Sequence, residues 1–257
     1  MRRLTLAGCA LLIAATALGA QTPTSGIAVL DLMRKHYAGK WYETLAFNQT
    51  TTIFRGDSST KQTWHESLQY FPTRGALLRI DNGDPALGNG TLSSWDSTWS
   101  VRGGKPGRIS GSGNPFIALI ENVYLQPADV TVHQLEPLHF DMTQVTSGAV
   151  DGRAAWIVGV SNAADSVTPQ FWIDKERLVV VRFLVQFAPT GPPLDVHLGK
   201  YVATGGGWLA TQVHMYQGGK PRQFEDYYDW QTRMKLDPGL FDPATWTSAK
   251  HWFHQGG

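Results

Sequence analysis

The sequence predicts an α+β protein in which one large, curved antiparallel sheet is covered by few helices. The second half of the chain consists of short apolar or alternating segments, separated by glycine- and proline-rich breaks at a spacing of roughly ten residues, as in consecutive hairpins. The first half contains a long threonine-rich segment that alternates in polarity. Only two segments show a clear helical period, and both are short.

Size and charge narrow the class of protein. The 257 residues are 42% hydrophobic and 17% charged, so the chain can bury one sizeable core. The formal net charge is +1 and both signs are mixed along the chain, which gives no indication of a nucleic-acid partner. Neither an internal repeat nor a linker is evident, and residues 21–257 are therefore expected to form a single domain.

Residues 1–20 have the pattern of a secretory signal peptide. Arg2 and Arg3 are followed by an apolar run, and Ala17–Ala20 then give a small-x-small pattern before Gln21. The apolar run is too short for a membrane span, and a polar segment follows it. We therefore expect cleavage before Gln21 and a periplasmic or secreted protein of the bacterial envelope, with no transmembrane span in the mature chain.

A competing interpretation of the same segment is a lipoprotein signal. Leu6–Cys9 resembles the motif at which bacterial lipoproteins are cut and acylated, but too few apolar residues precede Cys9 for such a signal. Cys9 is the only cysteine of the chain. Cleavage before Gln21 therefore leaves a mature protein without a thiol or a disulfide.

The first helix is expected between Ser25, which can cap its N-terminus, and Gly39, which can end it. Ile27, Leu30 and Met33 fall on one face of this helix. Polarity then alternates, which predicts strands. The predicted strands of this half are Trp41–Arg55, Lys61–Phe71 and Ala76–Asp81, and the glycine-rich residues 82–113 are predicted to form short strands and a long loop with a turn at 103–105.

The second helix is expected to begin at Asn114 and Pro115 and to end before Pro127, and a weaker helical segment covers residues 128–135. Strands follow from there to the C-terminal tail. The apolar face of the second helix is Phe116, Leu119, Ile120, Val123 and Tyr124, and the later strands are 154–161, 170–173, 178–187, 194–203, 208–217 and 224–235. The tail is a loop with apolar anchors at Leu240, Phe241 and Trp246.

An unusually apolar hairpin is predicted around the turn Asp174–Arg177. Simple alternation along residues 178–187 gives one face that carries Arg182 and Gln186 and one face that is wholly apolar and must be covered. A sheet of this length has to curl, and the helices either pack fully against its concave side or leave a space. The predicted inward face is Val179, Val181, Phe183, Val185 and Phe187.

At this hairpin the sequence resembles a known group. Trp172–Glu176, followed by an apolar strand with Arg182, is similar to the hairpin of the LolA/LolB-like superfamily of periplasmic lipoprotein carriers, and Gly152–Val160 is similar to the preceding strand. The resemblance does not extend to Asn82–Gly113. It implies an incomplete, half-open antiparallel barrel with two to three helices plugging the concave side, and a lipid or acyl chain held between sheet and helices.

The resulting hypothesis is an exported binding or carrier protein for a hydrophobic small molecule, a lipid or a lipoprotein acyl chain, without bond chemistry and without a cofactor. One alternative is a periplasmic sensor or interaction module with a filled interior and an envelope protein as partner. Another is a hydrolase that uses scattered serine, histidine and aspartate residues. Residues 115–125 are then either a fixed helix or a movable cover hinged at 103–113. The candidate cavity-lining residues are Leu30, Met33, Phe116, Ile120, Tyr124, Phe183 and Phe187.

Motifs for catalysis or metal binding are not found, and no catalytic or metal-binding residue is predicted. His251 and His254 have a chelating spacing but no third ligand nearby. His65 and Glu66 project to opposite faces of a strand, so they do not form an acid–base pair. Three further expectations are that His197 and His214 are half-exposed strand histidines, that Glu225 and Asp229 are solvated carboxylates, and that Trp64, Trp95, Trp99, Trp156 and Trp172 pack in the core rather than line a cavity.

The export prediction can be checked directly. N-terminal sequencing of the exported protein is expected to give a start near Gln21, because the small residues before it fit the signal peptidase. A mature start at Cys9 with an attached diacylglycerol would contradict this prediction and make the protein a membrane-anchored lipoprotein.

Overall fold

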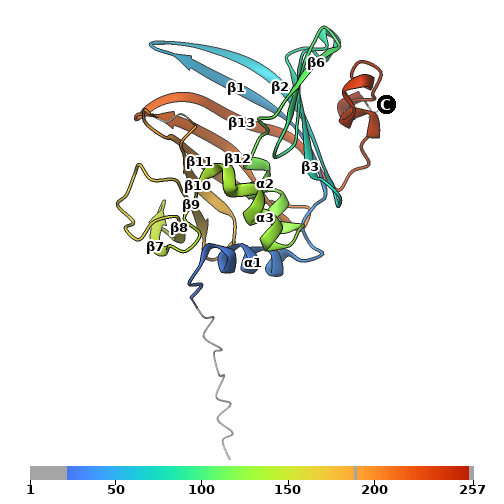
Figure 1. Cartoon of the computed structure of the whole chain (residues 1–257). Helices are drawn as coiled ribbons and strands as arrows, with labels where there is room; N and C mark the ends of the chain where they lie inside the picture. The colour runs from blue at the N-terminus through green and yellow to red at the C-terminus, as the bar shows by residue number, and fades with distance from the viewer. Residues whose placement is uncertain (1–21, 188–189, 255–257) are drawn as a thin grey trace, which may run out of the picture.

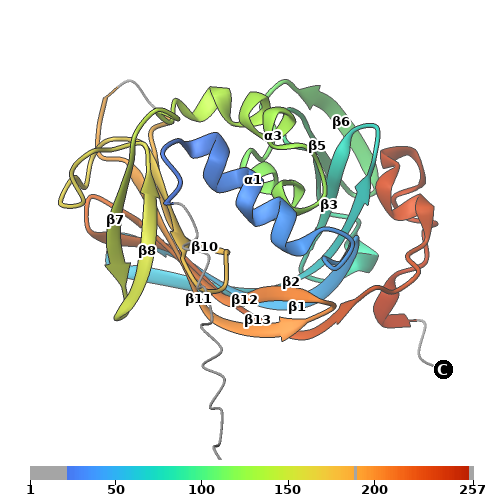
Figure 2. The same ribbon diagram turned by 90° about the horizontal axis from the view of Figure 1, so that it is seen from below.

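The computed structural model describes residues 22–187 and 190–254, so the predicted signal peptide and Cys9 lie outside the described residues. Within these ranges, thirteen strands form one antiparallel sheet in the order β6-β5-β4-β3-β2-β1-β13-β12-β11-β10-β9-β8-β7. The sheet curves around the helices without closing, because its edge strands β6 and β7 do not pair (Figures 1 and 2). The predicted α+β half-open barrel is therefore confirmed.

The strands are β1 (Thr44–Arg55), β2 (Ser58–Phe71), β3 (Gly75–Asn82), β4 (Gly90–Ser93), β5 (Thr98–Arg102), β6 (Lys105–Ser110), β7 (Val145–Val150), β8 (Arg153–Val158), β9 (Gln170–Asp174), β10 (Val180–Val185), β11 (Leu194–Thr204), β12 (Gly207–Gln217) and β13 (Lys220–Thr232). The α-helices are α1 (Gly26–Tyr37), α2 (Phe116–Ile120) and α3 (Ala128–Leu135), and η2 (Asn122–Tyr124) is a 3-10 turn between the last two.

The chain order explains why the helices lie in the concave side. Strands β1 to β6 form a meander that runs from the middle of the sheet to one edge, and β7 to β13 form a second meander that runs from the other edge back to the middle. The two meanders join where β1 pairs with β13. The connection from β6 to β7 therefore has to cross the open side, and it carries α2 and α3 over the concave face beside α1 (Figure 2).

A buried amide network fixes this connection to the sheet. Asn122 is fully buried, accepts a hydrogen bond from the backbone nitrogen of Ala76 at the start of β3 (2.8 Å), and donates one to Gln134 in α3 (3.0 Å). The side chain of Gln126 also donates to Gln134 (2.8 Å). Because buried polar groups are stable only when they are paired, the network holds η2 and α3 in one position against β3.

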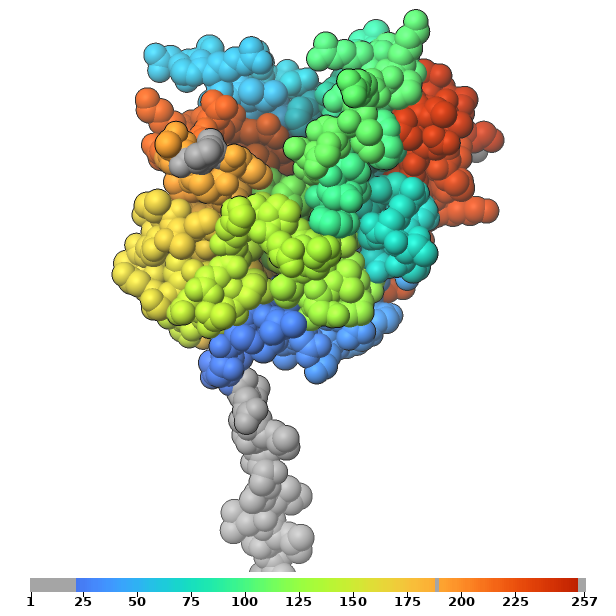
Figure 3. Space-filling view, in the orientation of Figure 1, coloured from blue at the N-terminus to red at the C-terminus, as the bar shows by residue number. Residues whose placement is uncertain are grey.

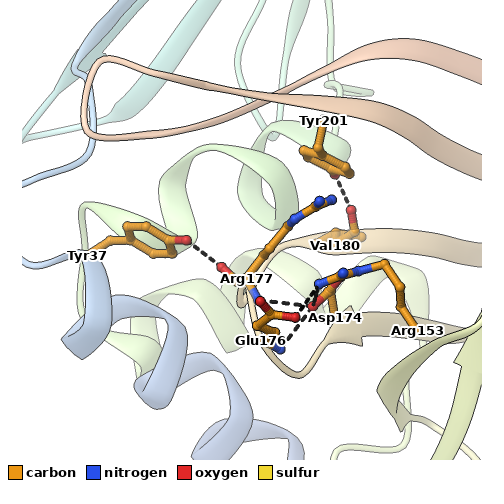
Figure 4. Close-up of polar contacts among 7 residues, drawn as sticks. All are labelled: Tyr37, Arg153, Asp174, Glu176, Arg177, Val180 and Tyr201. Atoms are coloured by element: carbon orange, nitrogen blue, oxygen red, sulfur yellow. Dashed lines mark hydrogen bonds and ion pairs between the residues drawn. The ribbon is translucent and has the colours of Figure 1, made fainter.

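The predicted turn at Asp174–Arg177 is confirmed and is held by the carboxylate of Asp174 (Figure 4). This carboxylate accepts hydrogen bonds from the backbone nitrogens of Glu176 and Arg177, both at 2.9 Å, and from the guanidinium of Arg153. The hydroxyl of Tyr37, the last residue of α1, donates to the carbonyl of Arg177. The hairpin is thereby attached to both β8 and α1.

The predicted inward face of β10 is wrong at Val181. The pairing of β10 with β9 shifts its register between Val180 and Arg182, which places an additional residue on β10 as in a β-bulge. Val180 therefore lies on the concave face with Phe183, whereas Val181 packs against the small apolar cluster around Trp172 on the convex face. A simple alternation cannot predict such a shift.

Two further expectations are corrected. Residues 82–113 contain the predicted short strands, which are β4, β5 and β6, but the connections between these strands are short and do not form one long loop. The predicted turn is made by Gly103 and Gly104 at positive φ (57° and 73°). The predicted single helix after Pro115 is interrupted at Glu121, whose backbone leaves the helical region (φ −127°, ψ −61°). The cover of the concave face is therefore two short pieces.

The C-terminal tail covers the convex side of one half of the sheet. Its predicted anchors Leu240, Phe241 and Trp246 are buried and pack against apolar residues of β1, β3, β4 and β5 (Figure 1). Beneath the tail lies a buried ion pair in β3, in which the guanidinium of Arg79 binds the carboxylate of Asp81 (2.8 Å) and stacks on the ring of Trp246 (3.7 Å).

The amide network gives a prediction about stability. Asn122→Ala leaves the buried nitrogen of Ala76 and the side chain of Gln134 without one partner each, and it is expected to lower the free energy of unfolding by about 1–3 kcal/mol. Asn162→Ala removes an exposed loop asparagine and is expected to cost less than about 1 kcal/mol. Urea unfolding measures both, and equal costs would contradict a structural role for Asn122.

Candidate ligand-binding cavity

A cavity of about 350 Å³ lies between the concave face of the sheet and the α2–η2 connection. Its size is at the lower end of the range of roughly 300–1,000 Å³ that is usual for small-molecule sites. Its walls come from β1, β2 and β3 on one side and from β10 to β13 on the other. The aromatic lining residues are Trp41, Tyr42, Phe47, Trp64, Phe116, Tyr124, Phe183, Phe187, Tyr201, Trp208 and Tyr227.

The mouth of the cavity is marked by Phe187, which is 62% exposed although it belongs to the lining. Its ring contacts that of Phe116 at the start of α2 (centroids 5.9 Å apart), and Phe116 in turn contacts Phe183 (4.5 Å). Figure 3 shows the helical connection in yellow-green on this face of the molecule, between the strands around β6 and those around β8. An apolar molecule would enter past these phenylalanines.

The inner wall of the cavity is a rigid aromatic stack. The ring of Tyr124 lies on that of Trp41 (3.5 Å, stacked), and both contact Tyr37 edge-on. On the sheet side of the cavity, the hydroxyl of Tyr201 in β11 donates to the carbonyl of Val180 in β10 (Figure 4). Because these rings are held by one another and by the backbone, the inner end has a fixed shape.

The structure places the seven predicted lining residues in two groups. Phe116, Ile120, Tyr124, Phe183 and Phe187 line the cavity. Leu30 and Met33 do not, because α1 lies behind η2 and α3, and these two side chains are fully buried against that layer. The sequence correctly predicted an apolar face on α1 but not which element that face would touch.

Four of the five tryptophans that were predicted to pack in the core do so, and one lines the cavity. Trp95 and Trp156 pack against the main core, Trp99 packs against the C-terminal tail, and Trp172 is buried on the convex side. Trp64 lines the cavity, so the expectation of core packing is wrong for this residue. It lies on the same face of β2 as the lining residue Leu68, a relation that period-two alternation already contains.

Three glutamates are the unexpected part of the lining: Glu66 in β2, Glu121 after α2, and Glu225 in β13. Their exposed fractions are 5%, 6% and 7%. The expectation of a solvated carboxylate is therefore wrong for Glu225. The prediction that His65 and Glu66 point to opposite faces is confirmed, because the ring of His65 lies beside Asn48 and Phe253, outside the cavity.

The three carboxyl groups have different partners. Glu225 accepts hydrogen bonds from the hydroxyl of Tyr227 (2.7 Å) and from the side chain of Gln223. Glu121 accepts one from the indole nitrogen of Trp41 (3.4 Å). Glu66 has no hydrogen-bond or ion-pair partner among the described residues, although its side chain is almost fully buried.

Burial disfavours the ionised form of these carboxyl groups. It raises the pKa of Glu121 from 4.5 to about 8, against the smaller opposing effect of the Trp41 hydrogen bond. Burial also raises the pKa of Glu225. The pKa of Glu66 is well above its ordinary value because of burial first and the nearby charge of Glu225 second.

Two other polar groups in the strands next to Glu66 have no hydrogen-bond partner among the described residues. The indole nitrogen of Trp64 and the side-chain oxygen of Gln49 are buried and have no hydrogen-bond partner within the described ranges. Trp64 and Gln49 are opposite each other in the pairing of β1 with β2. The pair formed by Phe47 and Glu66 lies two residues further along the same two strands. Unpaired polar groups therefore gather around Glu66.

The described cavity lining contains no histidine. His197 and His214 are opposite each other on β11 and β12, as the sequence allowed, and both are partly exposed on the convex face. His197 pairs with the carboxylate of Asp195 (3.0 Å), which also binds Arg182. Across the described residues, no group of three or more histidine, cysteine, aspartate or glutamate side chains could hold a metal ion.

No protein-family model matches the sequence, and neither does any curated protein. Solved structures do match the fold. A DUF1329 family protein from Desulfovibrio piger superposes with a TM-score of 0.59 and 15% identity, over 84% of this chain and 95% of the other. A putative outer membrane lipoprotein-sorting protein domain from Vibrio parahaemolyticus gives 0.59 and 12%, over 86% and 98%.

A LolA superfamily protein from Nitrosomonas europaea superposes with a TM-score of 0.50 and 10% identity, over 83% of this chain and 96% of the other. These similarities extend along nearly the whole of each partner chain. At such low identity they establish the fold alone. The resemblance to the LolA/LolB-like superfamily that the sequence indicated is thus confirmed at the level of the fold.

The buried carboxyl group of Glu121 gives a prediction about pH. Its pKa is about 8 in the folded protein and near 4.5 when exposed, so between these values the folded state holds a proton that the unfolded state has lost. The contribution of Glu121 to stability is therefore greatest below pH 4.5 and falls as the pH rises toward 8. One such group contributes at most about 1.4 kcal/mol per pH unit.

Glu121→Gln, which cannot ionise, is expected to reduce this decline, while the exposed Glu43→Gln leaves it unchanged. Glu66 and Glu225 shift in the same direction, so part of the decline remains in the variant. Urea unfolding between pH 5 and pH 8 measures the slopes. Identical slopes for Glu121→Gln and the parent would contradict a buried, protonated Glu121.

Proposed function

We propose that this protein is an exported binding protein that holds a lipid, an acyl chain or another hydrophobic small molecule in the cavity, without bond chemistry. The observation that carries the proposal is the cavity itself. Protein interiors are normally packed to the density of organic crystals, and an apolar space of about 350 Å³ leaves its lining without contacts on one side. A hydrophobic ligand would supply those contacts.

The neighbours in fold support the same class of function. One is named as a putative outer membrane lipoprotein-sorting protein domain and another as a LolA superfamily protein. By analogy of fold, we propose that the ligand of this chain is likewise a lipid or a lipoprotein acyl chain and that the chain acts in the bacterial envelope. No helix of the described residues is long and apolar enough to cross a membrane.

The two alternative functions are less well supported. An interaction module with a filled interior does not account for the cavity. A hydrolase with a serine, threonine or cysteine nucleophile and a histidine or lysine base is not supported, because the described lining includes none of these residues. The polar side chains of the lining are better suited to orienting a ligand.

The movable cover is not part of the proposal. Its expected hinge at Gly103–Gly113 is largely a β-turn and strand β6. The backbone nitrogen of Asn114 donates to the carbonyl of Ser94 (2.7 Å), and Asn122 is tied to β3 and α3. Because the connection is held at both ends, we propose a fixed α2 and entry of the ligand beside Phe187.

Two alanines in strands test the proposal. Ala210 on β12 lines the cavity, whereas Ala154 on β8 is exposed and does not belong to the lining. Ala210→Trp is expected to fill part of the cavity and weaken binding of a fluorescent fatty-alcohol probe about tenfold or more, since lost apolar contact of about 1.4 kcal/mol corresponds to tenfold. Ala154→Trp, the control, is expected to bind like the parent.

Thermal unfolding of both variants verifies that the fold is kept. Native mass spectrometry of gently purified parent protein is expected to show a co-purified hydrophobic molecule that is depleted in Ala210→Trp. If the parent binds no probe and carries no such molecule, the proposal is wrong and the interaction module becomes the better hypothesis.

A further inference from the structure

We propose that the cavity selects a hydrophobic molecule that carries a protonated amine, with the side chains of Glu66 and Glu225 as its counter-charges. This inference rests on the proposed function and deepens it, because it specifies the polar group of the ligand. The chemistry is shared by amine-bearing lipids and by smaller apolar amines.

The charge of the lining determines the sign of the ligand. Three glutamates line the cavity, and the described lining includes no lysine, arginine or histidine. A fatty-acid carboxylate or a phosphate would bring a negative charge into an apolar space beside acidic groups, with no cation to balance it, which is costly. A protonated amine brings the missing positive charge.

Glu66 supplies an acceptor that the protein itself leaves unused. It is 5% exposed, faces the cavity, and has no partner within the described ranges. Buried polar groups in folded proteins are nearly always hydrogen-bonded, so a partner from outside the chain is expected here. An ammonium group offers three N–H donors and can bind the carboxyl group of Glu66 directly, with Glu225 as a second nearby acidic group.

Glu225 is already oriented for this role. Tyr227 and Gln223 each donate a hydrogen bond to its carboxyl group, so little ordering remains to be done on binding. The two carboxyl groups are close enough for the charge of Glu225 to raise the pKa of Glu66. Two acidic groups at this distance repel when both are ionised, and a cation between them removes the repulsion.

The aromatic surroundings favour a cation as well. Trp64 and Tyr227 line the same part of the cavity, and the ring of Tyr227 is stacked on that of Phe47 (4.3 Å), the residue opposite Glu66 in the β1–β2 pairing. Aromatic faces attract ammonium groups, most strongly when water is excluded.

Binding of an amine has a proton signature. Burial raises the pKa of these carboxyl groups and a neighbouring ammonium group lowers it, so a carboxyl group that is protonated without the ligand passes its proton to the buffer on binding. An alcohol of the same length releases none. The titratable groups that face the cavity are Glu66, Glu121, Glu225, Tyr42, Tyr124, Tyr201 and Tyr227, and burial raises the pKa of every one of them.

The test is a calorimetric titration of the protein with dodecylamine, 1-dodecanol and dodecanoate at pH 7, in two buffers that differ in ionisation enthalpy. Dodecylamine is expected to bind about tenfold or more tightly than dodecanol, because a charge-assisted hydrogen bond exceeds a neutral one by about that factor. Dodecanoate is expected to bind most weakly, and only the amine is expected to release protons.

Glu66→Gln and Glu225→Gln are each expected to reduce the ratio of amine to alcohol affinity by about tenfold, whereas the exposed Glu43→Gln keeps the parent ratio. Equal affinities of the parent for amine, alcohol and carboxylate would overturn this inference and leave the proposed function intact. An amine preference that survives in both glutamine variants would overturn it too.

Absence of binding by all three probes would instead contradict the proposed function. If dodecylamine binds, competition experiments with other amines identify the class of the natural ligand. Displacement of dodecylamine by phosphatidylethanolamine, but not by phosphatidylglycerol, identifies an amine-bearing lipid, and displacement by phenethylamine alone identifies a smaller amine. Both of these results support the inference.

Discussion

The pairing of β1 with β13 holds the two halves of the molecule together. Each half is a local meander, in which every strand pairs with its neighbour in the sequence, but Leu45 to Ile53 of β1 pair with Gln223 to Thr232 of β13 near the other end of the chain. This long-range ladder turns two separate sheets into one curved wall. The concave space exists only because both halves bend around the same interior.

The helical connection then sets how much of that space stays open. It has to span the distance between the two edge strands, and it does so with short pieces that are fixed by Asn122 rather than with one long helix. A longer, continuous helix would cover more of the concave face. The interruption at Glu121 brings a carboxyl group into the lining beside the apolar residues of α2.

Much of the fold followed from local patterns, because alternation, glycine turns and caps are properties of neighbouring residues. The hairpin at Asp174, the helix after Ser25 and most strands could be predicted in this way. The bulge at Val181 could not, since it depends on the register with β9. The short strands within residues 82–113 were predicted without bounds, because glycine and serine usually favour loops and here form strands at the edge of the sheet.

The site was predictable only in its apolar part. Phe116, Ile120 and Phe183 were evident from amphipathic faces. Glu66 and Glu225 were not, because an acidic residue on a strand is usually solvated, and only the curvature of the sheet brings these two inward. Acidic residues that alternate in step with aromatic ones, as Glu66 does with Trp64, are the signal that was present in the sequence.

The C-terminal tail packs on the convex side of one cavity wall, around β3, and leaves the convex side of the other wall, around β11, exposed to solvent. Around Arg79 the sheet is covered on both faces, by the cavity lining inside and by Trp246 and its neighbours outside. The opposite wall, around His197 on β11, has water on its outer face. If a ligand were too large for the cavity, we would therefore expect the strands around β11 to move outward, while the strands around β3 stay in place under the C-terminal tail. A change in the shape of the protein would then be confined to the β11 side.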